Sequence, residues 1–194
     1  LHFALGNLFR RRGEYERAVR VHQHLLDRGD LSLDDRHRAQ HALALDYLKA
    51  GLLDRAEDAL LKLEGSRFEA QSRLALLANY ERSRDWQNAA VIAQKLETSG
   101  QGSFKGRLSH YLCEQAADCV AAKDLAQAQT LLAQAMTIAP GAARPRMDLA
   151  RLQHQQGERV QAFDTLVQAV AAAPSPGALK APLMARYSRN AGHC

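Results

Sequence analysis

Glycine, proline, cysteine and aromatic residues are all scarce in this chain of 194 residues. It has 12 Gly, 5 Pro and 3 Cys, and aromatic residues make up 6% of it. Short alternating segments rich in Val, Ile and Thr, which are typical of β-strands, are also missing. Leu, Ala, Gln, Arg and Glu dominate instead, so the composition predicts an all-helical protein that is long enough to bury a real core.

The cysteines are too few for a disulfide framework in a chain of this length. Cys113 and Cys119 are six residues apart. On one helix they would lie about 9 Å apart along the axis and point away from each other. Cys194 is the last residue. This pattern indicates a reducing compartment.

Long apolar runs and a dominant charge are missing too. No run of 18 apolar residues occurs, so the sequence predicts no membrane-spanning segment, and no signal peptide opens the chain. The net charge of +5 and the pI near 9.3 raise nucleic acid as a partner. Because acidic residues are interleaved with the basic ones, a solvated helical surface is favoured and no nucleic-acid partner is expected.

What the sequence does have is an alanine that recurs in a constant context. Successive copies are 38, 33, 39 and 34 residues apart. Each lies between a turn signal and an apolar helical pattern, and a period near 34 is typical of the tetratricopeptide repeat. The aligned alanines are Ala18, Ala56, Ala89, Ala128 and Ala162. Three of them follow a glycine by five residues: Gly13, Gly51 and Gly157.

Each repeat is predicted to be a helical hairpin with small residues where its two helices meet, because small side chains let helices approach closely. The first helix of each pair carries Gly6, Ala44, Leu77, Ala116 or Ala150. We therefore predict an all-α tetratricopeptide-repeat solenoid of antiparallel helix pairs, a single domain over residues 1–194. Its predicted units are 1–30, 37–65, 70–98, 109–140 and 143–174, with a partial sixth unit at 177–194.

The longer spacings indicate inserts at 28–35 and 98–106. Within the first insert, Ser32 has the position of a helix N-cap, with Asp35 three residues later as in a capping box. Pro140 and Pro174 each follow an aligned alanine by twelve residues, where the second helix of the pair should end.

Polar residues at fixed offsets from the small residue predict a partner-binding groove along the first helices. A groove of Arg, Lys, His and Asn side chains suits an extended acidic peptide or a free carboxylate. Plain solvated surface remains the alternative for each residue. The candidate residues are Asn7, Arg10, Arg11, Arg38, His41, Lys49, Gln71, Arg82, His110, Glu114, Arg144, Arg151 and His154.

Catalytic and metal-binding motifs are missing. His37 with His41, and His110 with Cys113, have spacings that could place two ligands on one helix face. Zinc takes four ligands and neither pair has obvious companions, so incidental placement is favoured. HExxH, GxxxxGK[ST] and GxSxG do not occur. We expect no enzyme activity, no catalytic residue, no metal and no cofactor.

Four stretches of the chain resemble one family more specifically than they resemble the general repeat. They are "LGNLFRRRGEYERAVRVHQHLL", "DYLKAGLLDRAED", "DWQNAAVIAQKLE" and "HYLCEQAADCVAAKDLAQAQTLL". In order and with similar inserts, they resemble the bacterial lipopolysaccharide assembly protein B family over essentially the whole chain.

The resemblance implies a regulator of lipopolysaccharide synthesis. Its members are anchored to the inner membrane by an N-terminal helix, face the cytoplasm and carry a C-terminal rubredoxin-like metal module. They promote degradation of the UDP-acyl-GlcNAc deacetylase by the membrane protease FtsH. This sequence has neither the anchor nor the paired CxxC motifs, so it is expected to be the cytoplasmic adaptor part of a longer protein, with deacetylase and FtsH as partners.

Two further interpretations stay open. The first is a co-chaperone-like module that clamps acidic or C-terminal peptides in its groove, for which Asn7 is the one clamp-like residue. His41 and Leu45 stand where such a clamp would need a cation and an Asn. The second is a nucleic-acid-binding helical repeat, motivated by the pI alone. Self-association is also plausible, since an unfinished solenoid leaves an apolar face bare.

Overall fold

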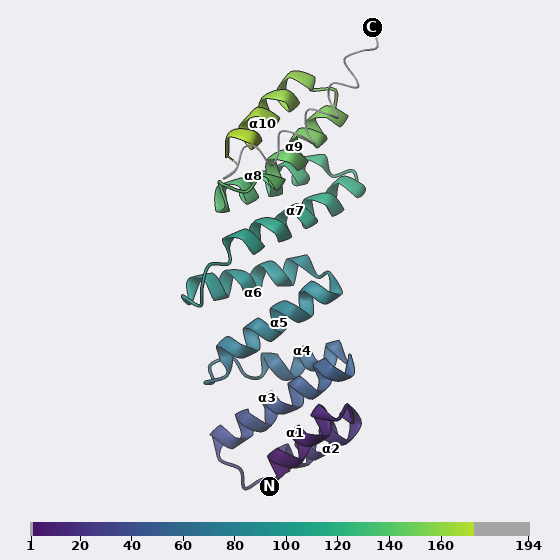
Figure 1. Cartoon of the computed structure of the whole chain (residues 1–194), viewed down its shortest axis with the longest axis vertical. Coiled ribbons are helices and arrows are strands. Elements are labelled where there is room, and N and C mark those ends of the chain that lie inside the picture. The colour runs from purple at the N-terminus through teal and green to yellow at the C-terminus, as the bar shows by residue number, and fades with distance from the viewer. Residues whose placement is uncertain (1, 173–194) are drawn as a thin grey trace. The chain divides into compact units, whose positions relative to one another are not determined.

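The structure is a computed structural model that describes residues 2–172. Over these residues the chain forms ten α-helices and no strand (Figure 1). The helices fall into two compact units, with the boundary in the chain between Gln101 and Gly102, and each unit is described by itself. The predicted sixth unit at 177–194 lies outside the described residues, and the prediction of one solenoid over the whole chain stays a prediction.

Both units are built from helical hairpins. The first unit consists of α1 (His2–Arg11), α2 (Tyr15–Leu26), α3 (Leu33–Ala50), α4 (Leu53–Leu61), α5 (Glu69–Ser83) and α6 (Trp86–Thr98). The second consists of α7 (Lys105–Ala121), α8 (Leu125–Ile138), α9 (Arg144–Gln155) and α10 (Arg159–Ala172). Within each unit every helix packs on its neighbours in the chain, and α1 also contacts α3 as α7 contacts α9.

The aligned alanines all lie in the core, which confirms the predicted register. Ala18, Ala56, Ala89 and Ala128 have no exposed surface and Ala162 is 1% exposed. The aligned residues of the first helices are buried as well: Gly6, Ala44, Leu77, Ala116 and Ala150. The third hairpin differs from the prediction, because its residue, Leu77, is large. The chain therefore has the all-α tetratricopeptide fold of antiparallel helix pairs, in which small side chains let paired helices pack closely.

The turn inside every hairpin has the same conformation. The residue five places before the aligned alanine is left-handed at Gly13, Gly51 and Gly157, with φ between 76° and 85°. The next residue donates its N–H to the carbonyl five residues back, at 2.9 Å in each hairpin. This is the Schellman ending of the first helix. Arg84 and Lys123 hold the same position in the other two hairpins, with φ of 58° and 63°.

The ends of the other helices follow local signals. Ser32 caps α3 by accepting the Asp35 N–H at 3.1 Å, which confirms its predicted role. α8 ends at Ile138, just before Pro140, as predicted, and Pro174 lies outside the described residues. α3 begins at Leu33 because this cap precedes it, four residues earlier than the first residue of the predicted second unit.

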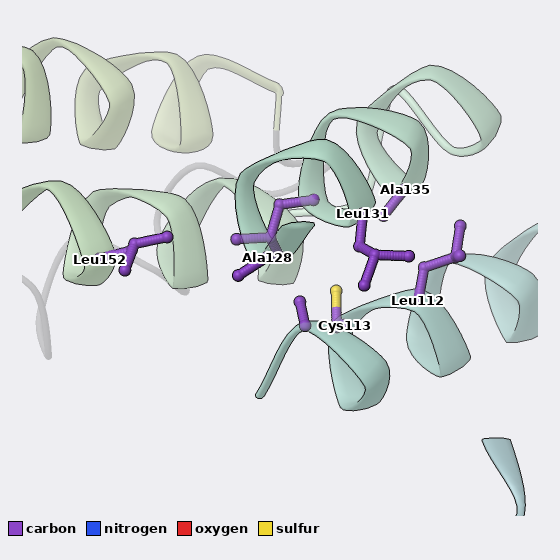
Figure 2. Close-up of a cluster of buried hydrophobic side chains, with 8 residues drawn as sticks. Leu112, Cys113, Ala128, Leu131, Ala135 and Leu152 are labelled. Carbon is purple, nitrogen blue, oxygen red and sulfur yellow. The ribbon is translucent and has the colours of Figure 1, made fainter. Parts of the chain in front are cut away.

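A continuous apolar cluster forms the core of the second unit (Figure 2). Side chains from α7, α8 and α9 meet there, and Ala128 and Ala135 are fully buried beside Leu132. Cys113 is 1% exposed and points its sulfur into this cluster (Figure 2). Cys113 is therefore a packing residue of the core.

Candidate partner-binding faces

Arg10 is tied into the first unit by three hydrogen bonds. Its guanidinium donates to Asp46 Oδ1 at 2.9 Å and to the Ala42 carbonyl at 3.1 Å, both on α3. It also donates to Asn7 Oδ1 at 2.7 Å, one turn earlier on α1. Two of the predicted groove residues, Asn7 and Arg10, are thus brought together, but much of their hydrogen-bonding capacity is used within the unit.

Asp46 is fully buried and accepts from two sides. Its Oδ1 pairs with Arg10, and its Oδ2 pairs with Nδ1 of His22, a residue of α2 that is also fully buried. A carboxylate in such a site needs partners for both oxygens, because an unpaired buried charge is costly. Arg10, Asp46 and His22 therefore form a bridge that ties α1, α2 and α3 together.

Aromatic contacts engage two other predicted residues of this unit. The Arg38 guanidinium carbon lies 4.5 Å from the centroid of the Phe3 ring, a cation–π distance. His41 stacks on Phe68 with ring centroids 4.9 Å apart. Burial, and then the charge of Arg10, lower the pKa of His41, which favours the neutral imidazole.

The remaining predicted residues of the first unit lie on the surface. Their side chains make no hydrogen bond or ion pair with any other described residue, and they are available to a partner: Arg11, Lys49, Gln71 and Arg82.

Arg144 joins two successive first helices in the second unit. Its guanidinium lies 2.5 Å from Nδ1 of His110 and 2.7 Å from Oε1 of Glu114, both on α7. It also pairs with Asp148 on its own helix at 3.3 Å, and Asp148 in turn pairs with Arg151 at 2.9 Å. Four of the predicted groove residues are therefore members of one network.

The repeat explains why these side chains meet. His110 and Arg144 each lie six residues before the small residue of their helix, and Glu114 and Asp148 each lie two residues before it. Burial alone would lower the pKa of Arg144, but its hydrogen bond to Glu114 and the charge of Asp148 outweigh this and raise it. The guanidinium remains a fixed positive charge at the edge of this face.

Beside this network is a hollow of about 200 Å³ between α7, α8 and α9. Its apolar lining comes from residues such as Ala116, Val120 and Leu152. The polar side chains around it are Arg144, Asp148, Arg151 and Gln155. An apolar floor with a charged edge suits an apolar side chain flanked by polar groups. His154, the other predicted residue of α9, is exposed.

The chemistry of Cys113 argues for packing rather than reaction. Burial and then the charge of Asp148 raise the pKa of this thiol to about 11, so it stays protonated at neutral pH. The thiolate is the reactive and metal-binding form of cysteine. Within residues 2–172, no three His, Cys, Asp or Glu side chains gather as metal ligands would. Of the pair His37 and His41, the ring of His41 stacks on Phe68, which is a packing contact.

Several of these side chains were not predicted from the sequence as parts of a site. The ion pairs involve Asp46, His22 and Asp148, and the aromatic contacts involve Phe3 and Phe68. Only Asp148 had a usable signal, because it repeats the offset of Glu114. None of the helices in residues 2–172 combines the length and apolar character that a membrane span requires.

Family models of the tetratricopeptide repeat match the chain in two places. One covers residues 1–38 and another covers residues 120–187. A solved structure of the protein MamA superposes with a TM-score of 0.50, covering 88% of this chain and 89% of that one. At 16% identity, this similarity supports the repeat fold alone.

Curated relatives agree on one family. Lipopolysaccharide assembly protein B of Escherichia coli K12 is 35% identical over 170 residues, which are 87% of this chain and 44% of that protein. The protein of the same name from Haemophilus influenzae is 30% identical over 163 residues, which are 84% of this chain and 41% of that protein. This chain thus spans less than half the length of these relatives. It belongs to the lipopolysaccharide assembly protein B family, as a segment of its tetratricopeptide-repeat region.

Proposed function

We propose that this segment is a non-enzymatic scaffold that binds a partner protein through the face formed by α7 and α9. The observation that carries the proposal is the 200 Å³ hollow, which combines an apolar floor with the charged edge of Arg144, Asp148 and Arg151. An inserted apolar side chain would be desolvated there while Arg151 pairs with a neighbouring carboxylate. The proposal needs no cofactor in this segment and no nucleic acid.

The relatives' name supports a role in lipopolysaccharide assembly. In the proposed role, the longer protein is anchored to the inner membrane with this segment on the cytoplasmic side. The segment then recruits the UDP-acyl-GlcNAc deacetylase to the membrane protease FtsH, as an adaptor for its degradation.

The test is capture from detergent-solubilised bacterial membranes with the immobilised chain. Arg151→Glu reverses one charge at the edge of the hollow, and Arg159→Glu reverses an exposed charge on α10 that does not line it. We expect the unaltered chain and Arg159→Glu to retain deacetylase or protease, and Arg151→Glu to retain much less. Failure of the unaltered chain to retain either protein contradicts the recruitment role. Equal retention by both variants contradicts the assignment of this face.

The second candidate is a peptide-clamping module of the co-chaperone kind. It is favoured by the exposed cations Arg11, Lys49 and Arg82 in the first unit, which have the charge that a peptide carboxylate needs. Asn7, its clamp-like residue, already accepts a hydrogen bond from Arg10. Peptides with a free and an amidated C-terminus separate the two functions, because only a clamp loses affinity when the carboxylate is removed.

A further inference from the structure

A second and larger cleft lies in the first unit, lined by α2, α3 and α4. Its volume is about 630 Å³, within the range of pockets that hold ligands. Each helix contributes one stripe at helical spacing: Gln23 and Leu26 from α2, with Asp27 at its C-cap; Arg36, His37, Gln40, Leu43 and Tyr47 from α3; Arg55, Asp58 and Ala59 from α4, with Lys62 at its C-cap. None of these residues belongs to the predicted groove.

The floor of the cleft is fixed. The Gln40 amide of α3 donates to the Ala59 carbonyl of α4 at 3.0 Å, and Leu43 and Ala59 are both buried at 3% exposure. At the α2 side, the Arg36 guanidinium lies 3.4 Å from the Leu26 carbonyl. The cleft is therefore a feature of three packed helices rather than of a mobile loop.

Three cations of the cleft have no partner among the described residues, unlike the two ion-paired arginines of the predicted groove. Arg10 and Arg144 are both ion-paired, whereas Arg55, Lys62 and His37 make no hydrogen bond or ion pair with any other residue in the part of the chain that the structure describes. A bound carboxylate would gain the most binding free energy from cations that have no other partner and lie beside buried side chains.

The cations lie at both ends of a floor that contains the apolar residues Leu43 and Ala59. Lys62 and His37 each lie three residues from the Ala59–Gln40 contact, at one end of the cleft, while Arg55 lies toward the other end with Tyr47. Arg55 of α4 and Lys62 at the C-cap of that helix are seven residues apart, or about 10 Å along the helix axis. An extended peptide covers that length with about three residues.

We propose that this cleft binds a short acidic segment of a partner protein, in which two carboxylate side chains three residues apart flank an apolar side chain. The carboxylates pair with Lys62 and Arg55, and the apolar side chain rests on Leu43 and Ala59. Asp58 lies between the two cations on α4 and repels a third carboxylate, which favours an uncharged residue at the centre. The proposal concerns other helices than the hollow of the second unit and stands without it.

The probe is a fluorescein-labelled peptide, Gly-Ser-Glu-Phe-Ala-Glu-Ser-Gly, measured by fluorescence polarisation against the whole chain. Two control peptides replace both Glu by Lys, or keep the composition but place the two Glu side by side. The double variant Arg55→Glu/Lys62→Glu removes both cations. Arg20→Glu/Lys105→Glu makes the same change of charge at exposed positions outside the cleft.

We expect Arg55→Glu/Lys62→Glu to weaken binding at least tenfold, a loss of about 1.4 kcal/mol, while the control double stays close to the unaltered chain. Both control peptides should bind more weakly. A spin label on the peptide should broaden the amide signals of Leu43 and Ala59 and spare those of Val120 and Leu152. Absence of binding at about 1 mM peptide, equal losses in the two doubles, or broadening at Val120 and Leu152 alone would overturn the proposal.

Discussion

Gly6 of α1 lies directly against the imidazole of His22 on α2. A methyl group added at Gly6 would approach Nε2 of that ring to 2.3 Å and its Cε1 to 2.4 Å. The ring cannot move aside, because its other nitrogen is paired with Asp46 and the side chain is fully buried. The glycine is therefore required by the close contact between the first two helices, not by its backbone conformation.

Gly6→Ala should destabilise the first unit by about 1–3 kcal/mol, the usual cost of overpacking a rigid site. The free energy of urea unfolding of the whole chain measures it. Gly106→Ala is the matched control, since it also lies in a helix and has open space around its Cα. That control should be neutral or slightly stabilising, because alanine is the better helix former. Equal stability of the two variants would show that the His22 ring can yield.

The roles of two adjacent arginines should separate clearly. Arg10 pairs with the buried Asp46, whereas Arg11 is exposed and makes no hydrogen bond or ion pair with other described residues. Removing one partner of a buried ion pair typically costs about 3–5 kcal/mol. Since the Arg10 side chain keeps 20% of its surface exposed, we expect Arg10→Ala to lose about 2–3 kcal/mol after allowing for screening by water.

Arg11→Ala should change the unfolding free energy by less than about 0.5 kcal/mol, as exposed substitutions usually do. Arg11 is consequently the better residue for testing binding along this face, because a loss of binding in an Arg10 variant would be confounded with a loss of structure. A comparable drop in stability for both variants would contradict the structural role of Arg10.

The repeat register could be predicted because its physical cause is local and periodic. Ala56 and Ala128 must be small wherever two helices cross closely, so the requirement recurs at each repeat and is visible in the sequence. The turn glycines Gly13 and Gly51 are visible for a similar reason, since φ near +80° favours glycine.

The bridge of Arg10, Asp46 and His22 could not be predicted. Asp46 lies 24 residues from His22 and 36 from Arg10, and nothing in their spacing shows that the carboxylate points inward. A lone Asp on an amphipathic helix is usually solvated. The network of Arg144 could be predicted only in part. Its residue types were at the predicted offsets, but which of them pair with one another depends on side-chain geometry.

Lys123 gives a test of the shared hairpin turn. It adopts φ of 63° at the position where three of the other four hairpins have glycine, and a left-handed conformation costs a residue with a Cβ about 1 kcal/mol or more. Lys123→Gly should therefore raise the unfolding free energy by about 0.5–1 kcal/mol. Ala122→Gly, one residue earlier at φ of −79°, should instead leave stability unchanged or lower it. Thermal unfolding followed by circular dichroism measures both, and a loss of stability in Lys123→Gly would contradict the account.

His41 should make the stability of the first unit sensitive to mild acid. Burial against Phe68 and the nearby charge of Arg10 lower its pKa in the folded chain below the ordinary value of 6.5. Between these two pKa values the unfolded chain binds a proton that the folded chain does not. The free energy of unfolding therefore rises with pH across this window, and this contribution is lost as pH falls below 6.5 toward the folded pKa.

His41→Gln should flatten this dependence between pH 7 and the folded pKa of His41, when urea unfolding is repeated in steps of pH. The comparison of slopes matters more than the stability at any one pH, because Gln also alters the stacking on Phe68. His24→Gln is the matched control, since His24 is an exposed histidine on α2. It should keep the slope of the unaltered chain. If the two variants had the same slope, protonation of His41 would not be the cause of the lower stability in acid. The His41 ring would then have to accept a proton while still stacked on Phe68.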